Sequence, residues 1–285
     1  MTCTWTTSRQ YSDYLALNVR GDQNFLSRVY HPSKKGTSLK GEAIYVNFWD
    51  SAEFTVASPT CSEFLPGTSC NGQIALTKFL KIIKHCFDDC AFAELTDGDM
   101  MALADASADA MFATLLPLIY ADIAANGTRY STGALNPTGA QILAAVNNAI
   151  AGIVSVGGGQ RMSIIFDRDY AGPFTTAAGG LFQPAGALGI DPGSPKGIIG
   201  YYLGSPVYIT PSNLVTADAT PLNICAFVID EYGYAFAPSG ENFPGTKLIV
   251  NEDDENGTNS VLFKYCTGYK IINIQKATVI HNTAS

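Results

Sequence analysis

The sequence has little charge for its length. Only 15% of the 285 residues are charged and 47% are hydrophobic, so charged side chains are too few to cover the surface of an isolated monomer. We therefore expect part of the surface to be buried against other subunits. Seventeen basic residues against twenty-five acidic ones give a formal net charge of -8. This acidic balance excludes a protein that grips nucleic acid through its overall field.

Histidine is scarce, and the usual signature of a serine nucleophile is missing. The only histidines are His31, His85 and His281, and no Gly-x-Ser-x-Gly sequence occurs. A catalytic triad would have to recruit one of these three side chains. We interpret them as ordinary surface or packing residues. A hydrolase with a non-standard site is the alternative that depends on them.

Long hydrophobic runs and an export signal are also absent from the sequence. No run of about eighteen apolar residues occurs, so no membrane-spanning helix is predicted. The seven cysteines are scattered and odd in number, and no secretory signal precedes them, so we expect reduced thiols. Cys61 and Cys70 flank a Pro-Gly loop and would be the pair to bond in an oxidising compartment.

Several short clusters invite a site and fit none. His85, Cys86 and Cys90 lie near two aspartates, but the spacing is not that of paired Cys-x-x-Cys ligands. Both cysteines are better interpreted as small hydrophobic residues. The acidic residues 252–255 lack the alternating ligands and the glycine of a calcium loop, which favours a solvated turn.

Two further clusters are equally weak as sites. Residues 157–159 are three glycines that follow a predicted helix and precede a strand, the reverse of the order in a phosphate-binding loop, so we expect a turn. Lys34 and Lys35 are too short a basic cluster for a nucleic-acid site. We assign no catalytic, cofactor-binding or metal-binding residue and expect no cofactor.

The first hundred residues indicate an arm followed by strands. Residues 1–38 carry isolated aromatics without periodicity, which predicts an extended arm that buries them on its own body or on a neighbour. Residues 42–56 alternate like a strand hairpin, and residues 57–72 predict a long loop, functional or mobile. Residues 73–95 favour a strand with a bend at the two aspartates 88 and 89.

A long amphipathic helix is predicted over residues 97–126. Thr96 or Asp97 supplies an N-cap, and Asn126 with Gly127 ends the helix. Its predicted buried stripe consists of Met100, Leu103, Ala104, Ala108, Met111, Leu115, Leu118 and Ile119. Pro117 is expected to kink the last third. The helix would be on the order of 40 Å long.

The middle of the chain predicts a second helix and a buried strand. Residues 138–151 form the helix, with Gly152 beyond its end, and residues 162–166 form a continuous apolar strand. Residues 167–170 suggest one more helical turn. Residues 171–197 are rich in glycine and proline and predict a long surface loop.

The last third of the chain is predicted to be mostly strands. Residues 197–211 predict a hairpin in which Gly204, Ser205 and Pro206 supply the turn. The further predicted elements are strands 222–228, 231–236, 261–266 and 269–274, a closing edge strand 277–280, and an acidic turn 251–257. No repeat and no clear linker divides the chain, and the mixture indicates an α+β fold.

The order of these elements resembles the major capsid protein of tailed double-stranded DNA bacteriophages, the Hong Kong 97-type fold. The resemblance rests on the arm, the hairpin with its loop, the long helix, and the Gly-Tyr-Tyr-Leu-Gly-Ser-Pro-Val-Tyr-Ile-Thr-Pro segment at residues 200–211. An apolar strand at 224–230 and a closing strand at 270–274 follow in the expected order. The resemblance covers most of the chain from about residue 40.

The resemblance implies a division of the chain into regions. These are an N-terminal arm (1–38), a hairpin with an extended loop (39–72), a peripheral domain (73–130) with a spine helix (97–126), an axial domain (about 131–237), and return strands of the peripheral domain (238–285). Some family members carry a scaffolding segment ahead of the arm; the chain shows none, so a separate scaffolding protein is implied. No Lys–Asn crosslinking pair is identified, so no catalytic residue is carried over.

The function implied is structural and non-enzymatic. The chain would self-assemble into hexamers and pentamers of an icosahedral shell that encloses double-stranded DNA without sequence-specific binding. Portal and decoration proteins would be further partners, no membrane is involved, and the protein would be assembled in the host cytoplasm and located in the virion. Another phage structural or adhesion protein forming trimers or fibres is an alternative, which the long helix disfavours. The hydrolase is a second alternative.

Overall fold

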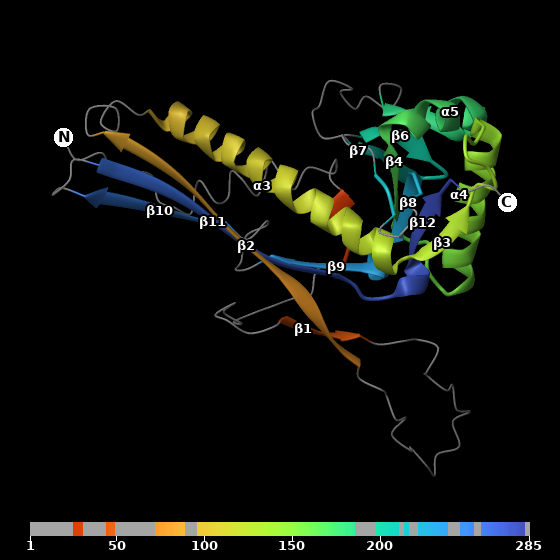
Figure 1. The fold of residues 1–285 in the computed structure, drawn as a ribbon, viewed down its shortest axis with the longest axis horizontal. Coiled ribbons are helices and arrows are strands. Elements are labelled where there is room, and N and C mark those ends of the chain that lie inside the picture. The colour runs from red at the N-terminus through yellow and green to blue at the C-terminus, as the bar shows by residue number, and fades with distance from the viewer. Residues whose placement is uncertain are drawn as a thin grey trace, which may run out of the picture.

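Two β-sheets and three α-helices make up the described part of the chain (Figure 1). The computed structural model describes residues 25–30, 44–48, 72–88, 96–185, 198–210, 214–216, 222–238, 246–253 and 258–282. The predicted loop 57–71, the bend after residue 88 and most of the predicted arm lie outside these ranges.

The first sheet is a long antiparallel ribbon. Its strands are β1 (Ile44–Phe48), β2 (Gly72–Asp88), β11 (Thr258–Ile271) and β10 (Thr246–Asp253), in that order, with β9 (Tyr234–Pro238) also paired to β11. The strand expected from residue 73 onward is confirmed as β2. Figure 1 shows β2, β10 and β11 extending together well beyond the second sheet.

Two turns predicted in this region are wrong. Thr267 and Gly268 do not separate two strands, because β2 pairs with them on one side and β9 on the other within a continuous β11. Residues 251–253 belong to β10, whose strand 246–253 was not predicted, and pair with residues 258–260. Hydrogen bonds to neighbouring strands override the local turn tendency in both places.

The long helix α3 (Asp97–Asn126) has the predicted bounds and continues through Pro117. Thr96 and Asp99 form a capping box, in which the Asp99 N–H donates to Thr96 Oγ1 (3.2 Å) and the Thr96 N–H donates to Asp99 Oδ2 (2.9 Å). The Thr96 side chain, then its backbone N–H, lowers the pKa of the Asp99 carboxyl below its usual value.

The predicted buried stripe of α3 is correct with one exception. Its fully buried members are Met100, Met111, Leu115 and Ile119. Leu118 is wrong, because it is 42% exposed on the opposite side of the helix from the sheets. Tyr120 and Ile123, not predicted, complete the buried face.

The second sheet has seven strands in the order β3-β12-β8-β4-β7-β6-β5. They are β3 (Thr128–Ser131), β12 (Ala277–His281), β8 (Ile224–Asp230), β4 (Met162–Asp167), β7 (Ser205–Thr210), β6 (Ile198–Tyr202) and β5 (Phe182–Pro184). The predicted closing edge strand is wrong in its place: β12 pairs with β3 on one side and β8 on the other. The short β3 was not predicted.

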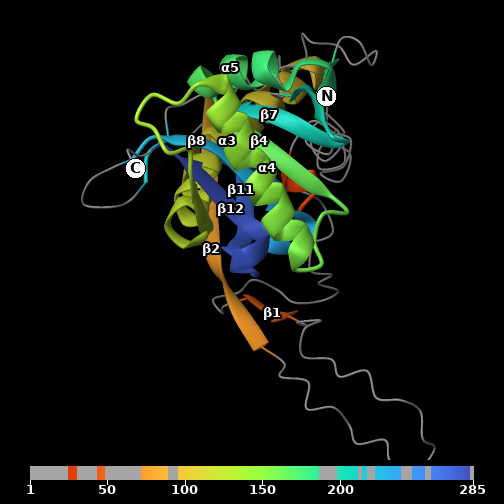
Figure 2. The same ribbon diagram turned by 90° about the vertical axis from the view of Figure 1, so that its right-hand side faces the viewer.

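This sheet lies between two helical layers. The helices α4 (Gly139–Ser155) and α5 (Arg168–Ala178) cover one face, where Ile164, Phe166 and Val228 meet them. The C-terminal half of α3 covers the other face. Figure 2 shows α4 lying across the strands. Successive residues of β4 and β8 thus enter opposite cores, as strand alternation requires.

The helix α4 is longer than the prediction. It runs to Ser155, so Gly152 lies inside it and does not end it. A Cβ at Gly152 would lie 2.1 Å from the Tyr130 hydroxyl oxygen, so glycine is needed for close packing of β3 on the helix. The three glycines that follow form the predicted turn, with Gly157 and Gly159 at positive φ.

The first part of the predicted 171–197 loop is helical. Asp167 accepts a hydrogen bond from the Asp169 N–H and caps α5, which runs to Ala178. Phe174 is fully buried against Phe166 and Tyr202, and this packing stabilises a helix that contains Pro173. Residues 186–197 lie outside the described ranges.

The hairpin formed by β6 and β7 is confirmed, but its turn lies earlier than predicted. Leu203 and Gly204 form it, with φ of 48° and 79°, and Ser205 already pairs with Tyr202. Two consecutive positive φ values are typical of a tight type I′ turn. Pro206 belongs to β7 opposite Tyr201, the next pair along, where antiparallel alternation requires no hydrogen bond from its nitrogen.

Candidate functional site

The two described histidines are far apart in the fold and have structural contacts. His85 on β2 lies 3.0 Å from the Ser107 hydroxyl of α3 and packs edge-on against Phe263. Ser107 is only 1% exposed, which keeps its hydroxyl from any substrate. His281 is buried at the end of β12, in the other sheet. His31 lies outside the described residues, so the structure does not test its part in the hydrolase alternative.

The cysteines do not form a metal centre where they are described. Cys86 is exposed on β2 and Cys225 is buried in β8. Burial, then the charge of Asp167, raises the pKa of the Cys225 thiol to about 12. Within the described ranges, no group of three His, Cys, Asp or Glu side chains could hold a metal ion. Cys61, Cys70 and Cys90 lie outside those ranges.

One acidic side chain faces buried phenols beneath α3. Asp122 Oδ1 accepts a hydrogen bond from the Asn126 side chain (2.9 Å), while its Oδ2 is buried. Burial raises the pKa of Tyr234 well above its usual value, and the neighbouring Asp122 carboxylate raises it further. Tyr269 is affected in the same way. These groups join α3 to β9 and β11.

The best-defined polar cluster lies where the chain crosses between the sheets. The crossings are two 3-10 turns, η5 (Glu231–Gly233) between β8 and β9, and η6 (Ile274–Lys276) between β11 and β12. We call this pair of turns the joint. Gly233 touches η6 so closely that a Cβ there would lie 2.2 Å from the Lys276 carbonyl oxygen. The two crossings therefore support each other.

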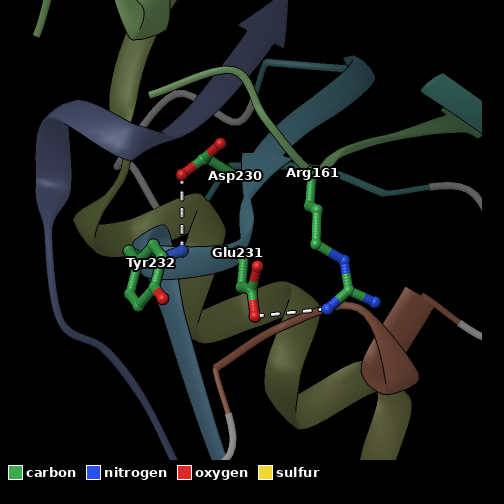
Figure 3. Close-up of polar contacts among 4 residues, drawn as sticks. All are labelled: Arg161, Asp230, Glu231 and Tyr232. Carbon is green, nitrogen blue, oxygen red and sulfur yellow. Dashed lines mark hydrogen bonds and ion pairs between the residues drawn. The ribbon is translucent and has the colours of Figure 1, made fainter. Parts of the chain in front are cut away.

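Charged side chains organise the joint (Figure 3). The Asp230 carboxylate accepts hydrogen bonds from the Gly159 N–H (2.8 Å) and the Tyr232 N–H (3.4 Å). Arg161 pairs with Glu231 at 3.4 Å. Asp230 thereby holds both the glycine turn after α4 and the start of η5. Such contacts set the direction in which the ribbon leaves the second sheet.

Residues 25–30, which we call the arm segment, pack against this joint. The Tyr30 N–H donates to the carbonyl oxygens of Glu231 (2.8 Å) and Tyr234 (3.1 Å), and the Tyr30 ring lies 5.5 Å from that of Tyr232. Phe25 is buried, with its ring 5.9 Å from that of Tyr120 on α3. This part of the predicted arm buries its aromatics on its own body.

One face of the ribbon is open. In β2, Ile83, His85 and Phe87 turn toward α3 and are half-buried. Ile82, Lys84 and Cys86, which alternate with them, are exposed. An apolar side chain such as Ile82 on an uncovered strand face is available for contact with another molecule. The described helices include none that is long and apolar enough to cross a membrane.

Comparisons with known proteins give matches by structure alone. No protein-family model matches the chain, and no curated protein is significantly similar to it. The solved structures include the capsid of Ralstonia phage GP4, which shares 12% identity at a TM-score of 0.58 over 92% of this chain and 91% of that chain. The capsid structure of the Cyanophage P-SCSP1u shares 11% identity at a TM-score of 0.58, over 90% and 87%.

A third similar structure is the capsid of an empty GTA particle, with 13% identity and a TM-score of 0.57 over 93% of this chain and 91% of that chain. In all three the similarity extends over nearly the whole of both chains. It also includes the elements on which the sequence resemblance rested, the long helix and the β6–β7 hairpin. The chain therefore has the α+β, Hong Kong 97-type fold of the capsid proteins of tailed phages.

Proposed function

We propose that the chain is a major capsid protein that self-assembles into hexamers and pentamers of an icosahedral shell enclosing double-stranded DNA. The observation that carries this proposal is the end-to-end structural similarity to capsid chains, each covered over 87% or more of its length. A fold by itself hosts many functions. Here the similar structures named above are all capsids, and the match leaves little of either chain over for another activity.

The physical character of the chain supports the same role. Its charged fraction is only 15%, and its ribbon has one open face with exposed Ile82. Surfaces of this kind are stabilised when they are buried against other subunits. In this proposal the protein is structural and not an enzyme, with no catalytic, cofactor or metal residue. It would be located in the virion after assembly in the host cytoplasm.

The proposed regions follow the two sheets. The ribbon with α3 would be the peripheral domain, and the second sheet with α4 and α5 would be the axial domain. Because β3 and β12 pair in the second sheet, the axial domain would also take these strands from the flanking regions. A separate scaffolding protein, a portal and decoration proteins would be the further partners.

Electron microscopy of the purified chain, combined with sedimentation velocity, tests the proposal. We expect closed shells or ring-shaped oligomers, alone or after co-expression with the scaffolding protein encoded beside it. Varying protein concentration and salt separates weak assembly from none. A chain that stays strictly monomeric under all of these conditions contradicts the proposal.

A further inference from the structure

One end of the second sheet carries no charge. The sequence has no Asp, Glu, Lys or Arg in α4, in residues 171–185, or in the β6–β7 hairpin. These elements are neighbours: β5, β6 and β7 are adjacent strands, and α4 packs beside α5. The Tyr202 hydroxyl of β6 also donates to Asn147 Oδ1 on α4 (2.7 Å). We call this region the neutral end.

Two leucines protrude from the neutral end. Leu181 and Leu203 are each 57% exposed, among the most exposed large apolar side chains in the described residues. Phe182 pairs with Tyr202 in the β5–β6 ladder, so Leu181 and Leu203, the next residues outward, lie at the same end of that pair of strands. The two exposed leucines therefore belong to one surface.

Leu203 has an unfavourable backbone as well as an exposed side chain. Its φ of 48° makes it the one non-glycine residue with positive φ among the described residues. Asn, Asp and Gly are preferred at this position of such a turn, because a branched side chain is strained there. Nothing within the monomer offsets that strain, since most of the Leu203 side chain is in solvent. Strain of this kind is often kept for a function outside the monomer.

We propose that the neutral end, centred on Leu181 and Leu203, binds a second copy of this chain. The inference rests on the proposed function and names the surface that self-assembly would use. Identical copies with a net charge of -8 repel one another, and an uncharged surface is where they approach with the least repulsion. Nucleic acid would require Lys or Arg at this end, and none is present.

The test uses Leu203→Asn and Leu181→Asp in the full chain, singly and together. Asn tolerates positive φ, so Leu203→Asn is expected to keep or raise the thermal midpoint of the dilute monomer. The same change is expected to weaken self-association by about tenfold or more, as measured by sedimentation velocity over a concentration series. Leu118→Gln, at an exposed position on α3 outside the neutral end, is the matched control and should leave association unchanged.

The opposite signs separate an interface from a structural role. If Leu203→Asn lowers the thermal midpoint and association together, or if both variants associate like the wild type, the inference is overturned. Shells that form normally from the double variant reject the inference and leave the proposed function standing. Small wild-type oligomers that the substitutions dissociate, without shells under any condition, support the inference and reject the proposed function.

Discussion

Cys225 and Cys86 are described thiols with opposite surroundings. Cys225 is fully buried in β8, and its pKa of about 12 keeps it protonated at ordinary pH. Cys86 is exposed on the open face of β2. Because the thiolate is the reactive form, accessibility and pKa both protect Cys225.

We expect iodoacetamide to alkylate Cys86 in the native protein and to leave Cys225 unmodified at neutral and mildly alkaline pH. Peptide mass spectrometry after labelling distinguishes the two sites. Labelling in denaturant, where both thiols should react, is the control. Rapid native labelling of Cys225 would show that β8 opens far more readily than its burial implies.

At the scale of single elements, Gly152 shows how a tertiary contact overrides a helix signal. Glycine in a helix interior is less stable than alanine by about 0.5–1 kcal/mol, which is why it suggests a helix end. In α4 the Tyr130 hydroxyl occupies the place that a Cβ would need. The helix therefore continues through the glycine to Ser155.

Gly152→Ala is expected to destabilise the protein in spite of the better helix propensity, because the new methyl group displaces Tyr130. Gly172→Ala is the matched control in α5, since a Cβ there meets nothing within 4 Å, and it should stabilise by about 0.5–1 kcal/mol. Urea denaturation measures both changes. Tyr130→Phe should recover part of the loss in the Gly152 variant, and no recovery would contradict the proposed clash.

At the scale of the whole molecule, the arm segment connects parts that are distant in sequence. Phe25 touches α3 through Tyr120 and the second sheet through Tyr208, whose ring lies 6.3 Å away. Tyr30 is hydrogen-bonded to the joint and to β9. A few residues near the N-terminus thus help to hold the ribbon and the second sheet in one arrangement.

Phe25→Ala is expected to destabilise the protein by about 3–5 kcal/mol, as is usual for a buried phenylalanine. Leu118→Ala, an exposed change on the same helix that Phe25 packs against, should stay within about 0.5 kcal/mol. Denaturant unfolding gives both values, and hydrogen exchange should show faster exchange in β9 and at the C-terminal end of α3. A loss below about 1 kcal/mol would mean that the arm segment contributes little to this arrangement.

The sequence alone determined the elements whose signals are local. The bounds of α3 follow from a capping box formed within four residues and a glycine after its last turn, and the apolar run of β4 is a short local pattern. The absence of an assignable catalytic constellation was likewise readable from the residue types. The order of such elements was enough to suggest the capsid fold that the structure shows.

Only the tertiary structure decided how the strands pair and what the glycines do. Thr267 and Gly268 lie within β11 because strands on both sides supply their hydrogen bonds, and β12 is central because β3 and β8 flank it. The neighbourhood of Leu181 and Leu203 likewise depends on the β5–β6 register. These features arise from pairings between residues far apart in the chain, and no local pattern in the sequence encodes them.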